Sequence, residues 1–171
     1  MSHPHAPSSS DPLDQRAFRD AMGRFVTGVA VATTIGADGV PLGVTINSFT
    51  SVSLDPPLVL FCLERRARSL PAFLDAGCFA VNLLAADQRS LSVRFARDAA
   101  DWKGVAHSRW MTGAPVLDGV VAACDCTLET TFDGGDHLIL VGRVHRIDAA
   151  PDREPLVYHR GRYARVDAPL F

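Results

Sequence analysis

The sequence lacks a strong net charge, a long apolar run and most of the motifs that would assign a function at once. Its 171 residues include 17 Lys and Arg against 19 Asp and Glu, which gives a net charge of −2. Without an excess of positive charge, neither nucleic acid nor an anionic membrane is an expected partner. No apolar run approaches the ~18 residues that a membrane-spanning helix needs, so we expect no transmembrane segment.

Familiar motifs of nucleotide binding, hydrolysis and metal binding are also missing. No GxGxxG follows a strand, and GxxxxGK[ST], GxSxG and HExxH do not occur. Cys124-Asp125-Cys126 is not a CxxC, and nothing nearby completes a zinc set, so no metal site is expected. Alternation predicts one strand face with the apolar residues Cys124, Cys126, Leu128 and Phe132, and Asp125 and Glu129 on the other.

The chain is too short to hold two cofactor domains side by side. At about 150 residues per domain, its length predicts one domain, which we assign to residues 13–167. Residues 1–12 are small, polar and rich in Pro and Ser, so we predict a disordered tail there. This tail has neither the basic start nor the apolar stretch of a secretory signal. We therefore expect a cytoplasmic protein with reduced cysteines.

β-Branched runs and Gly-rich turns predict a mainly β fold. Asp38-Gly39 predicts one hairpin, and residues 133–136 predict a second between strands at 120–132 and 138–147. Further extended segments are expected at residues 28–35, 43–47, 58–63, 79–84 and 155–166. About six strands with only short helices between them favour a closed or nearly closed antiparallel β-barrel.

Three short helices are expected around this barrel, at residues 13–26, 69–76 and 87–97. Asp11 is the expected cap of the first helix. In that helix Phe18, Met22 and Val26 recur every four residues and predict an apolar face. Gly77 is expected to end the second helix.

The densest polar segment runs from Thr45 to Ser53, between two apolar strands. Most of its side chains are hydroxyls or amides, and Asp55-Pro56-Pro57 follows it. Such groups at the end of a strand suit the edge of a heteroaromatic ring or a phosphate. The alternative is a turn-rich connection whose hydroxyls bond their own backbone.

Two weaker signals lie elsewhere in the chain. Arg65, Arg66 and Arg68 follow a strand and precede the expected start of a helix at Ser69. Guanidinium groups at a helix start predict an anion site, whereas a solvated loop is the alternative. His137 follows the second hairpin turn, and a lone histidine at a strand start is more often structural than catalytic.

Five stretches, in their order and spacing, resemble the short-chain flavin reductases, the NAD(P)H:flavin oxidoreductases of two-component monooxygenases. The stretches are FRDAMGRFVTGVAVATT (18–34), GVTINSFTSVSLDPPLVLFCL (43–63), CFAVNLLAADQRSLSVRFA (78–96), GGDHLILVGRV (134–144) and PLVYHRGRY (155–163). The TxNSFTSVSLxPP block and the Gly-Asp-His tripeptide are the specific parts. The first helix and first strand would match many proteins.

The resemblance implies a split antiparallel β-barrel with short peripheral helices that binds FMN or FAD at a homodimer interface. It implies that Thr45, Asn47 and Ser48 face the isoalloxazine edge, with Ser51 and Ser53 nearer the ribityl chain and phosphate. Cys62 would line the ring face, Arg68 and Ser69 would hold phosphate, and Phe95 would pack from a helix. The full implied set is Thr45, Ile46, Asn47, Ser48, Ser51, Val52, Ser53, Cys62, Arg68, Ser69 and Phe95.

For the second nucleotide, NADH or NADPH, the resemblance implies His137 and Tyr163. Hydride would pass from the nicotinamide to N5 of the flavin, and the two cofactors carry that chemistry themselves, so no catalytic acid or base is expected. A flavin-dependent monooxygenase would receive the reduced flavin. Two other functions stay open: a non-catalytic flavin-binding or electron-carrier protein, and a flavoenzyme like the pyridoxamine phosphate oxidases.

Overall fold

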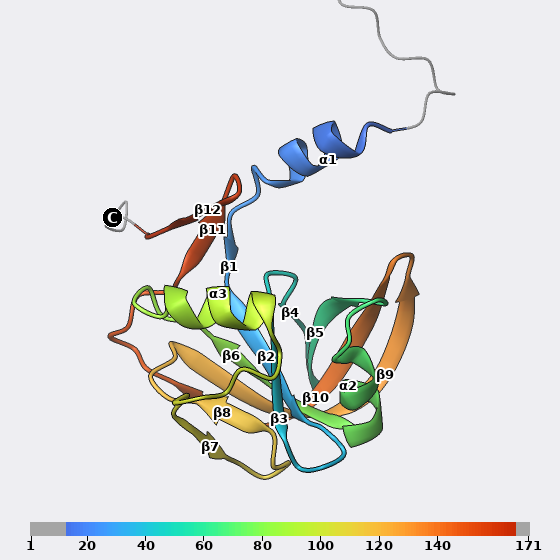
Figure 1. Cartoon of the computed structure of the whole chain (residues 1–171), viewed down its shortest axis with the longest axis vertical. Helices are drawn as coiled ribbons and strands as arrows, with labels where there is room; N and C mark the ends of the chain where they lie inside the picture. The colour runs from blue at the N-terminus through green and yellow to red at the C-terminus, as the bar shows by residue number, and fades with distance from the viewer. Residues whose placement is uncertain (1–12, 167–171) are drawn as a thin grey trace, which may run out of the picture.

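The structure, a computed structural model, describes residues 13–166, and its largest element is a seven-stranded antiparallel sheet (Figure 1). Its strands are β2 (Ala30–Ile35), β3 (Pro41–Ile46), β4 (Thr50–Leu54), β5 (Pro57–Glu64), β6 (Cys78–Leu83), β9 (Ala122–Gly134) and β10 (His137–Ala149). They are hydrogen-bonded in the order β3-β2-β6-β9-β10-β5-β4. The predicted tail at residues 1–12 lies outside the described residues, as does residue 167.

Two small sheets and three helices complete the described fold. One sheet pairs β1 (Thr27–Gly28), β11 (Val157–His159) and β12 (Arg162–Ala164), and the other pairs β7 (His107–Arg109) with β8 (Pro115–Leu117). The helices are α1 (Gln15–Met22), α2 (Leu70–Ala76) and α3 (Arg89–Arg97). Strands β3 and β4 are the edges of the large sheet, yet β3 also contacts β5, so the sheet curls around its core. The predicted mainly β split barrel with short peripheral helices is confirmed.

Aromatic rings from β5, β6 and α2 fill the barrel core. Phe61 meets the edges of Phe73 and Phe79 at centroid distances of 5.7 and 5.1 Å, and all three side chains are fully buried. Strand β10 passes close to Phe79, and a Cβ at Gly142 would lie only 2.2 Å from its ring. A glycine is therefore required there, and the core holds β5 and β10, which carry site residues, in fixed positions.

Three local predictions from turn and cap chemistry are confirmed. Helix α2 follows Ser69 and ends at Gly77, whose φ of +61° is the left-handed conformation of a helix C-cap. The β2–β3 hairpin turns at Asp38-Gly39, where Gly39 has a φ of +72°. The β9–β10 hairpin turns at Gly135 and Asp136, as its sequence predicts.

The first helix is shorter than predicted, and its apolar face is not buried. Its cap is Asp14, whose carboxylate accepts a backbone N–H at 2.9 Å. The predicted cap Asp11 lies outside the described residues. Phe18, Met22 and Val26 are 49%, 56% and 54% exposed, because α1 projects away from the barrel (Figure 1). Four-residue spacing predicts an apolar face but does not say what covers it.

Two extended segments are divided where the sequence predicts continuity. Residues 155–166 form a hairpin rather than one extended stretch, turning at Arg160 and Gly161 with φ values of +50° and +74°. Arg-Gly is an uncommon pair for such a turn, because only glycine takes positive φ without strain. The predicted strand at 28–35 is also split: Gly28 pairs with β11, whereas Ala30–Ile35 pairs with β3 and β6.

Strand β9 follows the predicted alternation only in part. Its two cysteines are buried, but Asp125 is fully buried as well, because the loop that carries Thr112 covers the second face. Phe132 is 57% exposed, because the hairpin runs beyond the core. The ladder with β10 also skips Glu129, and this irregularity changes which side chains share a face.

Candidate functional site

The candidate site is built along the edge of β3 that does not pair with another strand. The Gly43 N–H donates to the Ala99 carbonyl at 2.9 Å, so it points away from β2. Hydrogen-bonding direction repeats every two residues in an antiparallel pair, so the Thr45 N–H points the same way. The Thr45 hydroxyl donates to the Ser92 carbonyl at 2.7 Å, which holds α3 along this edge.

A hollow of about 230 Å³ opens beside Thr45 and is also lined by Asn47, Ser92 and Tyr163. The Tyr163 hydroxyl lies 2.9 Å from the Ser92 hydroxyl, and the Arg89 guanidinium stands 5.2 Å from the centre of the tyrosine ring. Tyr163 is therefore held in place beside the free edge of β3. The structure brings this predicted nicotinamide residue next to two predicted flavin residues.

A second hollow, of about 770 Å³, contains the predicted phosphate residues. Arg68, Ser69 and Phe95 line it, and Ala96 lines both this hollow and the first one. The Ser69 side chain is buried but makes no cap hydrogen bond to α2, and Arg68 is exposed. A hydroxyl and a guanidinium at one end, and backbone donors along β3, fit a ligand with a phosphate and a polar ring edge. These donors therefore fit a flavin nucleotide.

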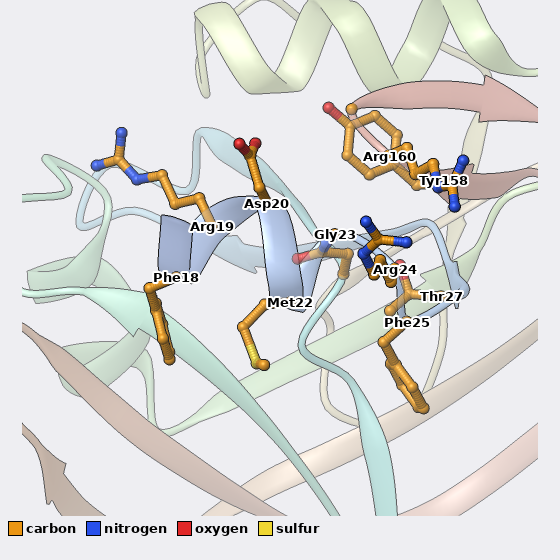
Figure 2. Close-up of a pocket in the computed structure, with 12 residues that line it drawn as sticks. Phe18, Arg19, Asp20, Met22, Gly23, Arg24, Phe25, Thr27, Tyr158 and Arg160 are labelled. Atoms are coloured by element: carbon orange, nitrogen blue, oxygen red, sulfur yellow. The ribbon is translucent and has the colours of Figure 1, made fainter. Parts of the chain in front are cut away.

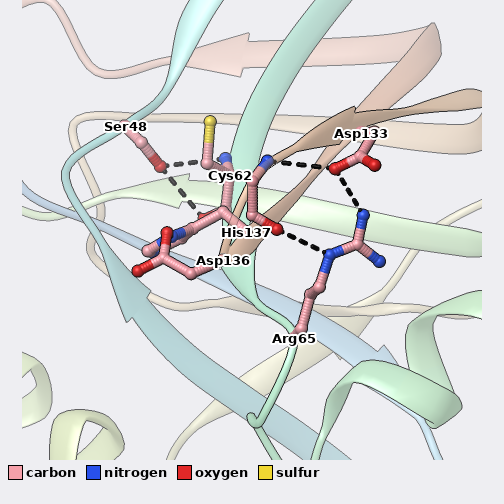
Figure 3. A network of polar contacts seen from close by, with 7 residues as sticks. Ser48, Cys62, Arg65, Asp133, Asp136 and His137 are labelled. Carbon is pink, nitrogen blue, oxygen red and sulfur yellow. Dashed lines mark hydrogen bonds and ion pairs between the residues drawn. The ribbon is translucent and has the colours of Figure 1, made fainter.

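The Ser48 hydroxyl hydrogen-bonds to the backbone of β5. It accepts the Cys62 N–H at 2.9 Å and donates to the Cys62 carbonyl at 3.2 Å (Figure 3). This pair of hydrogen bonds ties the chain after β3 to the middle of β5. The Ser48 side chain therefore holds the loop in place, and the predicted contact with a flavin ring falls to its backbone.

The remaining predicted flavin residues lie at different depths. Ile46 is 7% exposed and packs in the barrel core, so only its backbone borders the first hollow. The segment after Thr50 is strand β4 rather than a turn-rich loop, and its ladder with β5 skips Val52. Ser51 and Val52 are exposed and Ser53 is half-buried. Their roles toward a flavin stay predictions.

His137 and Tyr163 do not meet within one chain. His137 begins β10 opposite Glu64 of β5, with its Nδ1 2.7 Å from the Asp136 carboxylate. Tyr163 lies on β12, and Figure 1 shows β12 and the tip of the β9–β10 hairpin on opposite sides of β4. The two residues therefore flank the polar segment from its two sides.

Two contributors to the site were not predicted from the sequence. Ser92 is fully buried, bonds Tyr163 through its hydroxyl and receives Thr45 at its carbonyl. Arg89, one turn earlier on α3, lies over Tyr163. The available signal was a serine next to Leu91 on the apolar face of the predicted helix, where a polar residue needs a partner.

The described part of the chain holds neither a candidate metal cluster nor a candidate membrane-spanning helix. Among residues 13–166, no group of three or more His, Cys, Asp or Glu side chains is placed to hold a metal ion. No helix in the same range has both the length and the apolar character needed to cross a bilayer.

Most of the chain matches one protein family. Residues 22–167 match the family described as flavin reductase like domain. This match spans most of the chain, and the segments that build the two hollows all fall inside it. The chain belongs to the flavin reductase like family.

Individual relatives agree with this assignment. The reductase subunit HsaB of a flavin-dependent monooxygenase from Rhodococcus jostii is 41% identical over 160 residues, covering 93% of this chain and 82% of that protein. The FMN reductase (NADH) SmoA from Agrobacterium fabrum is 42% identical over 152 residues, covering 89% and 86%. The structure of the NADH:FAD oxidoreductase SgcE6 from Streptomyces globisporus with NAD and FAD fragments superposes with a TM-score of 0.88. It is 36% identical and covers 94% of this chain and 98% of that one.

Proposed function

We propose that this chain is an NAD(P)H:flavin oxidoreductase that reduces FMN or FAD and supplies the reduced flavin to a partner monooxygenase. The observation that carries the proposal is the pair of adjoining hollows along β3. They join the donors at Arg68 and Ser69 to the strand edge at Thr45 and to the anchored ring of Tyr163. The relatives support it, because they are named reductases of FMN, of FAD, or of monooxygenase systems.

In this proposal the flavin nucleotide lies along β3 and α3. Arg68 and Ser69 bind its phosphate, and the outward N–H of Thr45 and the backbone at Asn47 and Ser48 face the ring edge. N–H groups fixed by a sheet can stabilise negative charge that develops on the ring, with no cost of reorganisation. Ser51 and Ser53 lie toward the ribityl chain.

The protein contributes positioning more than acid–base chemistry. When bound, the flavin accepts a hydride at N5 from C4 of the nicotinamide, and both cofactors supply that reactivity themselves. The chain must hold the two rings at near-attack distance, about 3 to 3.5 Å, and keep water out. Tyr163 and His137 bind the nicotinamide nucleotide from the two sides of the polar segment.

Steady-state assays with NADH or NADPH, each with FMN or FAD, test the proposal. Loss of nicotinamide absorbance that depends on the protein and on flavin is expected in at least one combination, and that combination identifies the cofactors. Tight flavin binding without oxidation would favour an electron-carrier protein. Oxidation of a pyridoxamine phosphate in place of NAD(P)H would favour an oxidase. Inactivity in all four combinations would overturn the proposal.

A homodimer accounts for the exposed face of α1. Figure 2 shows Phe18 and Met22 projecting from one side of α1, Phe25 projecting in the same direction from the segment that follows, and Arg19 and Asp20 from the other side of the helix. Phe25 is 76% exposed, and no residue of α1 is buried by the described chain. Apolar surface of this extent marks an interface. The partner subunit would also add a wall to the site. A hollow of about 760 Å³ beside α1 shares Asn47 with the hollow next to Thr45, so a subunit bound to α1 would lie close to both.

Light scattering after size exclusion tests the dimer. The wild type is expected at twice the mass of the chain, and Phe25→Asp at the mass of one chain. Val40→Asp is the control, because Val40 is 49% exposed on a turn away from α1. A wild type that elutes as a monomer would refute the dimer.

We also place the protein in the cytoplasm, because all four cysteines are free thiols, as in a reducing compartment.

A further inference from the structure

Arg65 ties the tip of the β9–β10 hairpin to the end of β5 (Figure 3). Its Nε donates to the Gly135 carbonyl at 2.9 Å, and its Nη2 donates to Oδ1 of Asp133 at 2.7 Å. Its backbone N–H donates to the Asp136 carbonyl at 3.0 Å. Arg65 therefore bonds three residues at the hairpin tip, two through its side chain and one through its backbone.

The same turn carries His137. The Asp136 carboxylate lies 2.7 Å from the His137 Nδ1, and the Asp133 carboxylate also accepts the Gly135 N–H at 3.0 Å. The Arg65 guanidinium is the main cause that lowers the pKa of Asp133 below its ordinary value. The carboxylate is therefore charged at neutral pH. The guanidinium holds Asp133 and Gly135, and the Arg65 backbone N–H holds Asp136, whose carboxylate lies beside the imidazole.

Beyond the backbone ladders, which pair His137 with Glu64 of β5 and with Gly134 of β9, the hairpin tip has few side-chain contacts. Residues 132–136 are exposed and bring no buried apolar side chain to the turn. A second arginine pair, Arg143 with Glu129, joins the two strands at 2.6 and 2.8 Å but lies away from the turn and does not involve β5. Exposed ion pairs contribute little to stability by themselves, so we expect the Arg65 contacts to affect geometry more than unfolding.

Arg65 also stands three residues before Arg68 in the same loop. Arg68 and Ser69 line the hollow assigned above to the flavin phosphate. One loop thus carries the proposed phosphate donors at one end and the tether of the proposed nicotinamide histidine at the other. A shift of the hairpin would change the position of one nucleotide relative to the other.

We infer that Arg65 is a positioning residue, which fixes the hairpin so that His137 is set against the nicotinamide nucleotide. This inference rests on the proposed function. The Arg65 side chain acts through Asp133 and Gly135, which hold the turn that precedes His137. A displacement of about 1 Å in a positioning group can reduce turnover strongly, so loss of the tether should be visible in kinetics.

Kinetics of Arg65→Gln test the assignment. We expect the KM for the nicotinamide nucleotide to rise about tenfold, with the flavin KM within about twofold of wild type. Arg65→Lys keeps the charge but not the two-pronged geometry, so an intermediate KM is expected. Arg143→Gln is the matched control, since it breaks an equivalent exposed pair of the same hairpin, and its KM values should stay within about twofold. Equal losses for flavin and nicotinamide nucleotide would overturn the inference.

A double variant separates positioning from a general charge effect. In a His137→Ala background, Arg65→Gln should cause no further rise in KM, because the two changes interrupt one route. A rise in KM in the double variant that multiplies the two single effects would contradict the inference.

Amide hydrogen exchange of residues 134–137 gives a readout that needs no activity. It should be faster in Arg65→Gln than in Arg143→Gln. Unchanged exchange in Arg65→Gln would refute the tether. If Arg65→Gln exchanges faster but the wild type has no reductase activity, only the proposed function is refuted.

Discussion

Replacement of Gly43 by alanine tests whether α3 must lie close against β3. A Cβ added at Gly43 would lie 2.8 and 2.9 Å from two carbons of the Phe95 ring. Ordinary carbon contacts lie near ~3.5 to 4.0 Å, so the ring or the helix must retreat by roughly 0.7 Å or more. Phe95 is 2% exposed and its ring packs on Trp102 at a centroid distance of 4.9 Å, so Trp102 limits how far the ring can move.

The expected cost follows from these contacts. Overpacking of a filled core costs about 1 to 3 kcal/mol. If α3 moves instead, it stretches the Gly43–Ala99 and Thr45–Ser92 hydrogen bonds, each worth about 0.5 to 1.5 kcal/mol. We expect Gly43→Ala to lower the free energy of unfolding by about 2 kcal/mol, and Tm by about 4 to 8 °C. Because Phe95 lines the phosphate hollow, flavin affinity should fall about tenfold.

Chemical denaturation and flavin titration of the same preparations provide the assay. Gly28→Ala is the control, because a Cβ there has nothing within 4 Å and the residue does not have a positive φ. This control should be neutral or stabilised by up to about 1 kcal/mol. If Gly43→Ala unfolds within about 0.5 kcal/mol of the control and binds flavin equally well, the close contact of α3 and β3 is not required.

Two further predictions concern buried and exposed carboxylates. Thr112→Ala should cost about 2 kcal/mol in unfolding, because the buried Asp125 loses a hydroxyl donor, whereas Thr112→Ser should keep it; equal stability of the two variants would contradict this role. The Arg143 guanidinium lowers the pKa of Glu129 in the folded protein below the ordinary value of 4.5. The ion pair therefore contributes to stability above pH 4.5, and this contribution is lost as the pH falls through the pKa of Glu129 in the folded protein. NMR titration should therefore give a higher midpoint for Glu129 in Arg143→Gln than in wild type, and an unchanged midpoint would show that the pair does not persist in solution.

The fold was predictable where local chemistry decides the structure. Gly77 ends α2 and Asp38-Gly39 turns the β2–β3 hairpin because few other residues take these conformations. Arg160-Gly161 turns the β11–β12 hairpin with less typical residues, and this hairpin was missed. The direction of α1 was not predictable either, because a periodic apolar face does not specify the surface that covers it.

The candidate site was predictable in its main segment but not in its supports. Hydroxyls and amides from Thr45 onward stand out between two apolar strands, and the structure places Thr45 and Asn47 at one hollow. The hydrogen bond between Ser92 and Tyr163 joins residues that are 71 positions apart, a separation that no local pattern reports. The individual roles toward flavin and nicotinamide came from family resemblance and not from pattern.

We propose that one surface of this chain brings a flavin and a nicotinamide nucleotide together for hydride transfer. The most direct test is an anaerobic single turnover of the flavin-loaded protein with the active nucleotide carrying deuterium at the transferred C4 position. We expect flavin bleaching and loss of reduced nicotinamide to occur together, and both to be slower than with the unlabelled nucleotide. Bound flavin that stays oxidised with NADH and with NADPH would contradict this proposal.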